Sequence, residues 1–186
     1  MTKASDAKKR AGKITTVVFD VDGVLTDGGI ILDSSGQEIK RFNVQDGTGM
    51  KYLLRSGLHA AFISGRESEA VKARAKDLGV AYLYQGYKDK VKANHDLKRV
   101  LSVSDSEIAC LGDDLPDMPL MLRSGLAVAV ANSRPEIKRL ANLVTKAPGG
   151  AGAAREFVEW LLKATGRWDA IMSRYLPSSG GRSEKA

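Results

Sequence analysis

The sequence predicts an α/β protein built on a doubly wound, mostly parallel β-sheet. Apolar, β-branched runs typical of buried strands alternate with amphipathic stretches of helical period along most of the 186 residues. Strands separated by helices require right-handed crossovers and therefore a mostly parallel sheet. Glycines and acidic residues follow several of the apolar runs, at the edge where open α/β sheets bind ligands. Together these observations indicate a Rossmann-like arrangement.

The first half of the chain contains a β-hairpin and three strands of the expected sheet. The run from Ile14 to Asp20 is apolar and β-branched, as in a strand buried on both faces. Apolar segments 30–32 and 39–42 flank a turn sequence and predict a β-hairpin flap. A helix over 46–56 places apolar residues on one face before Gly57, which stands in the stop position. A strand, a glycine-terminated helix and another strand are then expected over residues 58–63, 67–78 and 80–84.

The second half continues the alternation. A helix over about 89–100 precedes the apolar run 108–111, which reads as a buried strand. The next strand, 126–130, is followed by a helix that Pro135 opens, because proline fits the first helical turn. A short strand and an amphipathic helix complete the order over residues 143–145 and 153–164.

We expect three parts: a basic flexible tail over 1–13, the main α/β domain over 14–166, and an extension over 167–186. The extension is expected to be helical first, because apolar residues from Trp168 to Leu176 have helical spacing. It is then expected to be flexible, because Pro177 opens a stretch rich in serine and glycine.

Composition and charge limit the partners. Hydrophobic content of 43% and charged content of 27% are ordinary for a soluble globular protein. No apolar stretch approaches the ~20 residues of a membrane span, so no membrane partner is expected. The net charge of +7 lies mostly in residues 1–13, and no basic strand is rich in aromatic residues, so nucleic acid is not expected as a ligand. A single cysteine, Cys110, excludes an internal disulfide and fits a reducing cytoplasm.

The strongest chemical signal is the pair Asp20 and Asp22 at the end of the first strand. Residues two apart in an extended chain point to the same side, so both carboxylates can face one site. One can attack a phosphorus while the other manages a proton, and the pair also suits a hard divalent cation. The competing interpretation is a strand that simply ends in an Asp-Gly turn.

Three further groups follow at later strand ends. Ser64-Gly65-Arg66 offers a hydroxyl and free N–H groups for a phosphate, although an ordinary helix cap would use the same residues. Lys90 stands at a helix start, against the macrodipole, and can neutralise a transferring phosphoryl group. Three acids cluster after the strand 108–111 and repel one another unless a cation compensates. These are Asp113, Asp114 and Asp117. Each signal is weak alone, but their order along the chain is specific.

The chain resembles the haloacid dehalogenase superfamily of phosphatases over about residues 14–162. Its four motifs match Asp20-Val-Asp22-Gly-Val, Ser64, Lys90 and Gly112-Asp113-Asp114. The resemblance implies that Asp20 is the nucleophile, that Asp22 is the general acid and base, and that Ser64 and Lys90 hold the phosphoryl oxygens. It also implies Mg²⁺ on the Asp20 and Asp113 carboxylates and the Asp22 carbonyl, with Asp114 steering Lys90 or a metal-bound water and Asp117 in support. Segments 20–64 and 64–90 leave no room for the cap domain of many members.

Within that superfamily the chain is similar to the capless 3-deoxy-D-manno-octulosonate 8-phosphate phosphatases. Matching phrases include Thr26-Asp27-Gly28, Asp46-Gly-Thr-Gly49-Met-Lys51 and Gly149-Gly150-Ala-Gly152. The resemblance implies a sugar-acid phosphate as substrate and a cytoplasmic homotetramer acting in lipopolysaccharide precursor synthesis. The implied substrate-binding residues are Thr26, Ser64, Gly65, Arg66, Arg74 and Lys90. Arg66 and Arg74, on one face of the expected helix, can bind the sugar carboxylate, although Arg74 can equally be a solvated helix residue.

Other functions stay open at this point. Phosphatases of nine-carbon sialic-acid-type 9-phosphates share most of these motifs, and the arginine at position 66 favours the eight-carbon branch. A non-catalytic binding subunit would have no need of Asp22 or Lys90. A phosphatase of nucleic acids or phosphoproteins would exploit an open, capless site, whereas pairing of the apolar hairpin between copies would close it.

Overall fold

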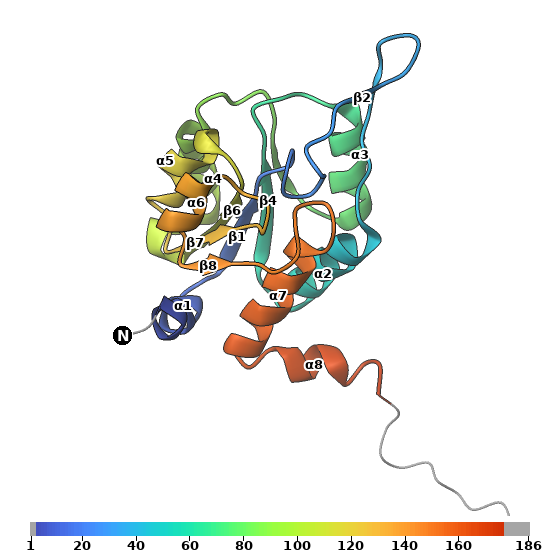
Figure 1. The fold of residues 1–186 in the computed structure, drawn as a ribbon. Helices are drawn as coiled ribbons and strands as arrows, with labels where there is room; N and C mark the ends of the chain where they lie inside the picture. The colour runs from blue at the N-terminus through green and yellow to red at the C-terminus, as the bar shows by residue number, and fades with distance from the viewer. Residues whose placement is uncertain (1–2, 177–186) are drawn as a thin grey trace, which may run out of the picture.

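The structure is a computed structural model that describes residues 3–176, and a six-stranded parallel sheet runs through its centre (Figure 1). The strand order is β5-β4-β1-β6-β7-β8. The strands are β1 (Thr16–Phe19), β4 (His59–Ile63), β5 (Tyr82–Tyr84), β6 (Ile108–Gly112), β7 (Leu126–Ala129) and β8 (Leu143–Val144). This arrangement confirms the predicted α/β class, and β1, which the aspartate pair follows, is an inner strand that pairs with both β4 and β6.

Helices cover both faces of the sheet, as a doubly wound fold requires. One face is covered by α2 (Val44–Arg55), α3 (Glu69–Leu78) and α7 (Ala153–Ala164). The other is covered by α4 (Lys90–Leu101), α5 (Met118–Met121) and α6 (Pro135–Leu140). Two short 3₁₀ helices, η1 (Asp105–Glu107) and η2 (Leu115–Asp117), join elements around β6. The short helix α5 was not among the predicted elements.

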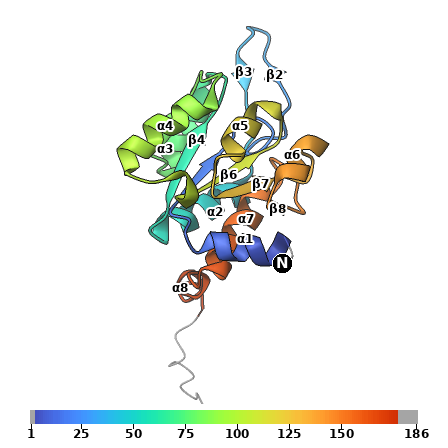
Figure 2. The same ribbon diagram turned by 90° about the vertical axis from the view of Figure 1, so that its left-hand side faces the viewer.

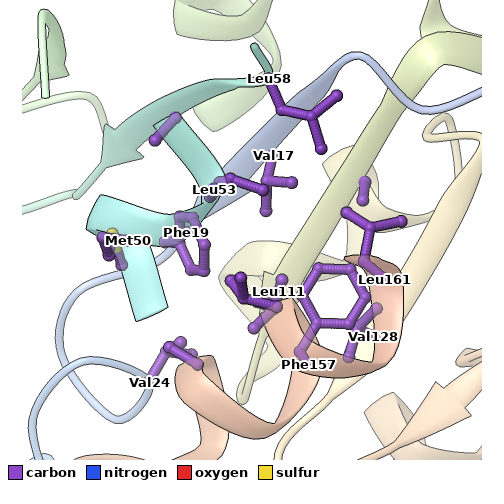
Figure 3. Close-up of a cluster of buried hydrophobic side chains, with 14 of the residues drawn as sticks. Val17, Phe19, Val24, Met50, Leu53, Leu58, Leu111, Val128, Phe157 and Leu161 are labelled. Carbon is purple, nitrogen blue, oxygen red and sulfur yellow. The ribbon is translucent and has the colours of Figure 1, made fainter. Parts of the chain in front are cut away.

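Alternation along β1 explains why both faces are covered. Val17 and Phe19 point into the cluster formed with α2 and α7, whereas Val18 belongs to the cluster on the other side. Figure 3 shows Phe19 and Phe157 within the first cluster, between the sheet and the helices. Both phenylalanines are fully buried. Burying such side chains contributes about 1.5–3 kcal/mol each, and this packing holds the carboxyl end of β1 in place.

The predicted hairpin is present as β2 (Ile31–Leu32) and β3 (Glu38–Ile39), which form a separate antiparallel ribbon. It rises beyond the carboxyl ends of the sheet strands (Figure 2). Its apolar residues are exposed: Ile30 by 63%, Leu32 by 60% and Ile39 by 50%. The flap therefore presents an apolar outer surface to whatever lies against it.

The amino-terminal segment differs from the flexible tail that we predicted. Residues Lys3–Ala11 form helix α1, and the side chains of Ala7 and Ala11 are fully buried in the core that also contains α7. Small apolar residues four positions apart give the otherwise basic segment one face that can dock.

At the other end, α8 (Trp168–Met172) confirms the helical start of the extension. The stretch predicted to be flexible, 177–186, lies outside the described residues. Cys110 is buried in β6, and burial raises the pKa of its thiol, in keeping with a small core residue. None of the helices among residues 3–176 combines the length and apolarity needed to cross a membrane.

Candidate active site

Most of the predicted site residues meet in one cleft at the carboxyl ends of the central strands. Asp20 and Asp22 follow β1, Ser64 follows β4, and Asp113 follows β6. Lys90 reaches the same place from the first turn of α4. The cleft has a volume of about 320 Å³. It is lined by Asp20, Asp22, Gly28, Ser64, Gly65, Arg66, Lys90, Asp113, Asp114, Pro116 and Asp117. Parallel strands end at one edge, so residues distant in sequence converge there.

Lys90 is the buried cation at the bottom of the cleft. Its Nζ contacts the Asp20 carboxylate and donates a 2.6 Å hydrogen bond to Asp117 Oδ1. The side chains of all three residues are less than 10% exposed. Burial acts to lower the pKa of Lys90, but Asp20 and Asp117 outweigh burial and raise that pKa. The lysine is therefore fully charged, which is the form that stabilises a phosphoryl group.

Asp117 binds both the loop after β6 and Lys90. Its Oδ2 accepts the N–H groups of Asp113 at 2.9 Å and Asp114 at 3.3 Å, while its Oδ1 accepts from Lys90. The resemblance implies that Asp114 steers Lys90 or a metal-bound water; in the structure Asp117 is the acid that contacts Lys90 besides Asp20, and a role of Asp114 toward a metal-bound water stays a prediction. The Asp114 carboxylate caps η2 by accepting the N–H of Leu115 at 2.8 Å. The 3₁₀ turn between them brings Asp117, not Asp114, back to the lysine.

The carboxylates of Asp20, Asp113 and Asp117 fit a cation. One oxygen from each lies within 4.8 Å of the others. Burial, followed by repulsion from Asp117 and Asp114, raises the pKa of Asp113 to about 6. Burial and the charge of Asp117 likewise raise the pKa of Asp20, against the opposing effect of Lys90. Because both oxygens of Asp117 are already engaged, Asp20 and Asp113 are the carboxylates that can hold a hard divalent ion.

A tight turn holds the two aspartates toward the cleft. Gly23 has φ +100°, and a Cβ on it would lie 2.2 Å from Asp113 Oδ2, so only glycine lets the turn approach β6. Gly149 packs behind this turn, since its Cβ would lie 1.7 Å from the Gly23 carbonyl oxygen. Thr26, predicted to bind substrate, closes the turn by accepting the N–H of Gly28 at 3.2 Å, and it does not line the cleft.

Asp22 and Ser64 face each other across the cleft, and Ser64 Oγ lies 3.4 Å from Asp22 Oδ2. Ser64 Oγ also accepts the N–H of Arg66 at 3.1 Å, which orders the start of the loop. Asp22 is in contact with Lys40 Nζ, a residue that sequence reasoning missed. The signal was present, because charged Glu38 and Lys40 alternate with Ile39 and must point away from the apolar surface.

The two arginines predicted to act together lie apart. Arg66 lines the cleft, in the loop before α3 rather than on the helix, and its side chain is 50% exposed. Arg74 on α3 lies above the Phe42 ring, with 5.8 Å between its Cζ and the ring centroid, and it pairs with Asp77 at 2.8 Å. Because Arg74 fills the space beside Gly47 on α2, it does not reach the cleft of its own chain.

Asp46, which begins one of the segments that resemble the family, has a structural role. The buried carboxylate of Asp46 accepts the N–H groups of Gly152 at 3.2 Å and Arg155 at 2.8 Å. The amino-terminal end of α7 therefore receives its cap from α2, because Gly152 has no side chain to supply one. This contact fixes α7 beside the glycine loop that supports the catalytic turn.

Comparisons with known proteins agree with this geometry. A sequence profile described as haloacid dehalogenase-like hydrolase matches residues 81–156. The chain is 42% identical to a 3-deoxy-D-manno-octulosonate 8-phosphate phosphatase of Yersinia pestis, over 87% of this chain and 86% of that protein. It is similar to a solved structure of such a phosphatase from Moraxella catarrhalis in complex with magnesium, phosphate and a 3-deoxy-D-manno-octulosonate molecule. That match has a TM-score of 0.90 and 38% identity, over 92% of this chain and 99% of the other. A probable phosphatase structure from Pseudomonas syringae matches at 46% identity and a TM-score of 0.91, over 94% and 99% of the two chains.

Proposed function

Because this chain belongs to the 3-deoxy-D-manno-octulosonate 8-phosphate phosphatases, a family of haloacid dehalogenase-like hydrolases, we propose that it removes phosphate from this eight-carbon sugar acid. The family expected from the motifs is thereby confirmed. The observation that carries the proposal is the meeting of Asp20, Asp22, Ser64 and Lys90 in one cleft. The reaction would serve lipopolysaccharide precursor synthesis.

The cleft supplies the groups of a two-step phosphoryl transfer. In the first step a carboxylate oxygen of Asp20 forms a bond to phosphorus while the bond from phosphorus to the sugar oxygen breaks. Protonated Asp22 gives its proton to that leaving oxygen. In the second step water attacks the phosphorus, Asp22 takes its proton, and the bond between Asp20 and phosphorus breaks to release phosphate. Lys90 and the Ser64 hydroxyl hold the phosphoryl oxygens, whose charge must be stabilised throughout.

Mg²⁺ is the cofactor of this site. The Asp20 and Asp113 carboxylates and the Asp22 backbone carbonyl would hold it, and the crowding of buried carboxylates fits a divalent cation. When bound, the ion neutralises charge on the phosphoryl group. The relative from Moraxella catarrhalis contains magnesium.

Arg66 is the residue that would select a sugar acid. Its guanidinium lines the rim of the cleft, and a guanidinium binds a carboxylate through two parallel hydrogen bonds. A nine-carbon sialic-acid-type phosphate stays as the alternative substrate, because it also carries a carboxylate.

We expect a homotetramer in the cytoplasm. The flap exposes apolar side chains at Ile30, Ile31, Leu32 and Ile39 beside a cleft without a cap. Pairing of flaps between copies would bury this surface and help to close the cleft. A single buried cysteine fits a reducing compartment. Gel filtration with light scattering tests the assembly, and a monomer at micromolar concentration would contradict it.

The deciding experiment measures phosphate release with Mg²⁺ from 3-deoxy-D-manno-octulosonate 8-phosphate and from a nine-carbon sialic-acid 9-phosphate. Asp20→Asn protein serves as the blank. A higher kcat/KM for the eight-carbon substrate supports the proposal. A higher kcat/KM for the nine-carbon substrate would instead support the alternative substrate. Arg66→Ala is expected to raise KM for the sugar-acid phosphate more than for an aryl phosphate. Equal effects on the two substrates would remove the role of Arg66 in selection.

A further inference from the structure

The flap places two charged residues against the rim of the cleft. Along residues 38–40 the side chains alternate, so Ile39 faces outward while Glu38 and Lys40 turn inward. The side chain of Lys40 is 3% exposed and that of Glu38 is 17% exposed. Charged side chains this well covered need partners, because burying an unpaired charge is costly. Both find them among residues of the cleft.

Glu38 is bound to the arginine that lines the cleft. Arg66 Nη2 donates to Glu38 Oε1 at 2.7 Å, and Lys40 Nζ lies 3.2 Å from the same oxygen. Burial acts to raise the pKa of Glu38, but the hydrogen bonds from Arg66 and Lys40 outweigh it and lower that pKa. The carboxylate is therefore ionised at neutral pH. It occupies on Arg66 the kind of position that a carboxylate ligand would take.

We propose that Glu38 is a resident carboxylate on Arg66, which the carboxylate of a sugar-acid substrate must displace. This inference rests on the proposed function, since it requires that Arg66 bind the substrate carboxylate. An uncharged group at that end of a substrate, such as an aryl ring, gains nothing by displacing Glu38. Because of this competition, a ligand must bind Arg66 more strongly than Glu38 does. This requirement favours groups that bind the guanidinium in bidentate fashion.

The same ion pairs tie substrate binding to the flap. Glu38 lies in β3, so the Arg66–Glu38 pair joins the flap to the loop after β4. Lys40 is shared between Glu38 and Asp22. When a ligand takes Arg66, Lys40 becomes the remaining charged partner of Glu38 among these pairs. The flap therefore keeps its contact with Asp22 through Lys40 while the arginine changes partners.

Glu38→Gln tests this proposal, because glutamine keeps the shape of the side chain and removes the competing charge. Calorimetry measures the dissociation constants of free 3-deoxy-D-manno-octulosonate and of inorganic phosphate in the presence of Mg²⁺. We expect the sugar acid to bind Glu38→Gln roughly fivefold more tightly, the size of a partly exposed ion pair, and phosphate binding to be unchanged. Glu69→Gln is the matched control, because it removes the same charge from the nearby start of α3, and it is expected to leave both constants unchanged.

An Arg66→Ala background separates competition by Glu38 from substrate recognition by Arg66. In Arg66→Ala protein the Glu38→Gln change is expected to have no effect on sugar-acid binding, since the pair is already broken. Unchanged or weaker sugar-acid binding by Glu38→Gln, or an equal gain for phosphate, would overturn the competition while leaving the function of Arg66 intact. If Arg66→Ala by itself leaves sugar-acid binding unchanged, both the proposed substrate recognition by Arg66 and the proposed competition by Glu38 are refuted.

Discussion

Replacing Asp113 by asparagine is expected to stabilise the cation-free protein even though it removes a proposed metal ligand. Burial and repulsion from Asp117 and Asp114 raise the pKa of Asp113 from 3.8 to about 6. The unfolded chain releases this proton at lower pH than the folded chain does, so stability falls as the pH rises from about 4 to about 6 and stays lower above that range. The full shift corresponds to about 3 kcal/mol. Because the carboxylate is only partly buried, screening reduces the expected gain to about 1–2 kcal/mol.

Urea denaturation in EDTA measures this gain. At about pH 7.5 the free energy of unfolding of Asp113→Asn should exceed that of the wild type, and at about pH 5 the difference should shrink because wild-type Asp113 is then mostly protonated. Added Mg²⁺ should reverse the order, since only the wild type gains binding energy. Asp114→Asn is the matched control: asparagine caps a helix as well as aspartate does, so the free energy of unfolding should change by less than about 0.5 kcal/mol. If Asp113→Asn were less stable than the wild type in EDTA at about pH 7.5, charge crowding would be refuted.

Three other substitutions test single contacts. Asp20→Asn should lower phosphate release by roughly a thousandfold or more while the circular dichroism spectrum is unchanged, and substantial residual turnover would contradict a covalent role. Lys90→Met should cost about 3–5 kcal/mol in urea denaturation, because it leaves Asp20 and Asp117 buried without their cation, whereas a loss below about 1 kcal/mol would show that the network adapts. Gly149→Ala should lower the free energy of unfolding by about 2 kcal/mol or more and reduce turnover, because the added Cβ would meet the Gly23 carbonyl oxygen. Gly12→Ala is the control and should change neither quantity, because a Cβ there would have ordinary contacts.

The central part of the site could be predicted because its residues are tied to strand ends. Asp20 and Asp22 are two residues apart after a buried strand, and Ser64 follows the next strand in the sheet. A period of two and the shared edge of parallel strands place such residues together without knowledge of the packing. The predicted strands and the long helices α2, α4 and α7 are present for the same reason, since each has a clear period and a recognisable end.

Contacts between residues far apart in the sequence could not be predicted in this way. The basic composition of residues 1–13 suggested a flexible tail, yet Ala7 and Ala11 dock against the core as helix α1. Arg74 has the right spacing from Arg66 for a shared site, but α3 begins at Glu69, so the two side chains leave the chain in different directions. Lys40 contacts Asp22 from a flap whose apolar residues are exposed.

The fold class, the family and the residues that gather in the cleft could be predicted from the sequence, because they depend on local periodicity and on short motifs. Which acids contact Lys90 and which carboxylate pairs with Arg66 could be seen only in the folded structure. Asp114 and Asp117 are three residues apart, and only the 3₁₀ turn of η2 brings Asp117 to the lysine. Ion pairs between distant segments depend on ångström-scale placement of side chains by the packed core, and residue spacing along the chain does not contain that information.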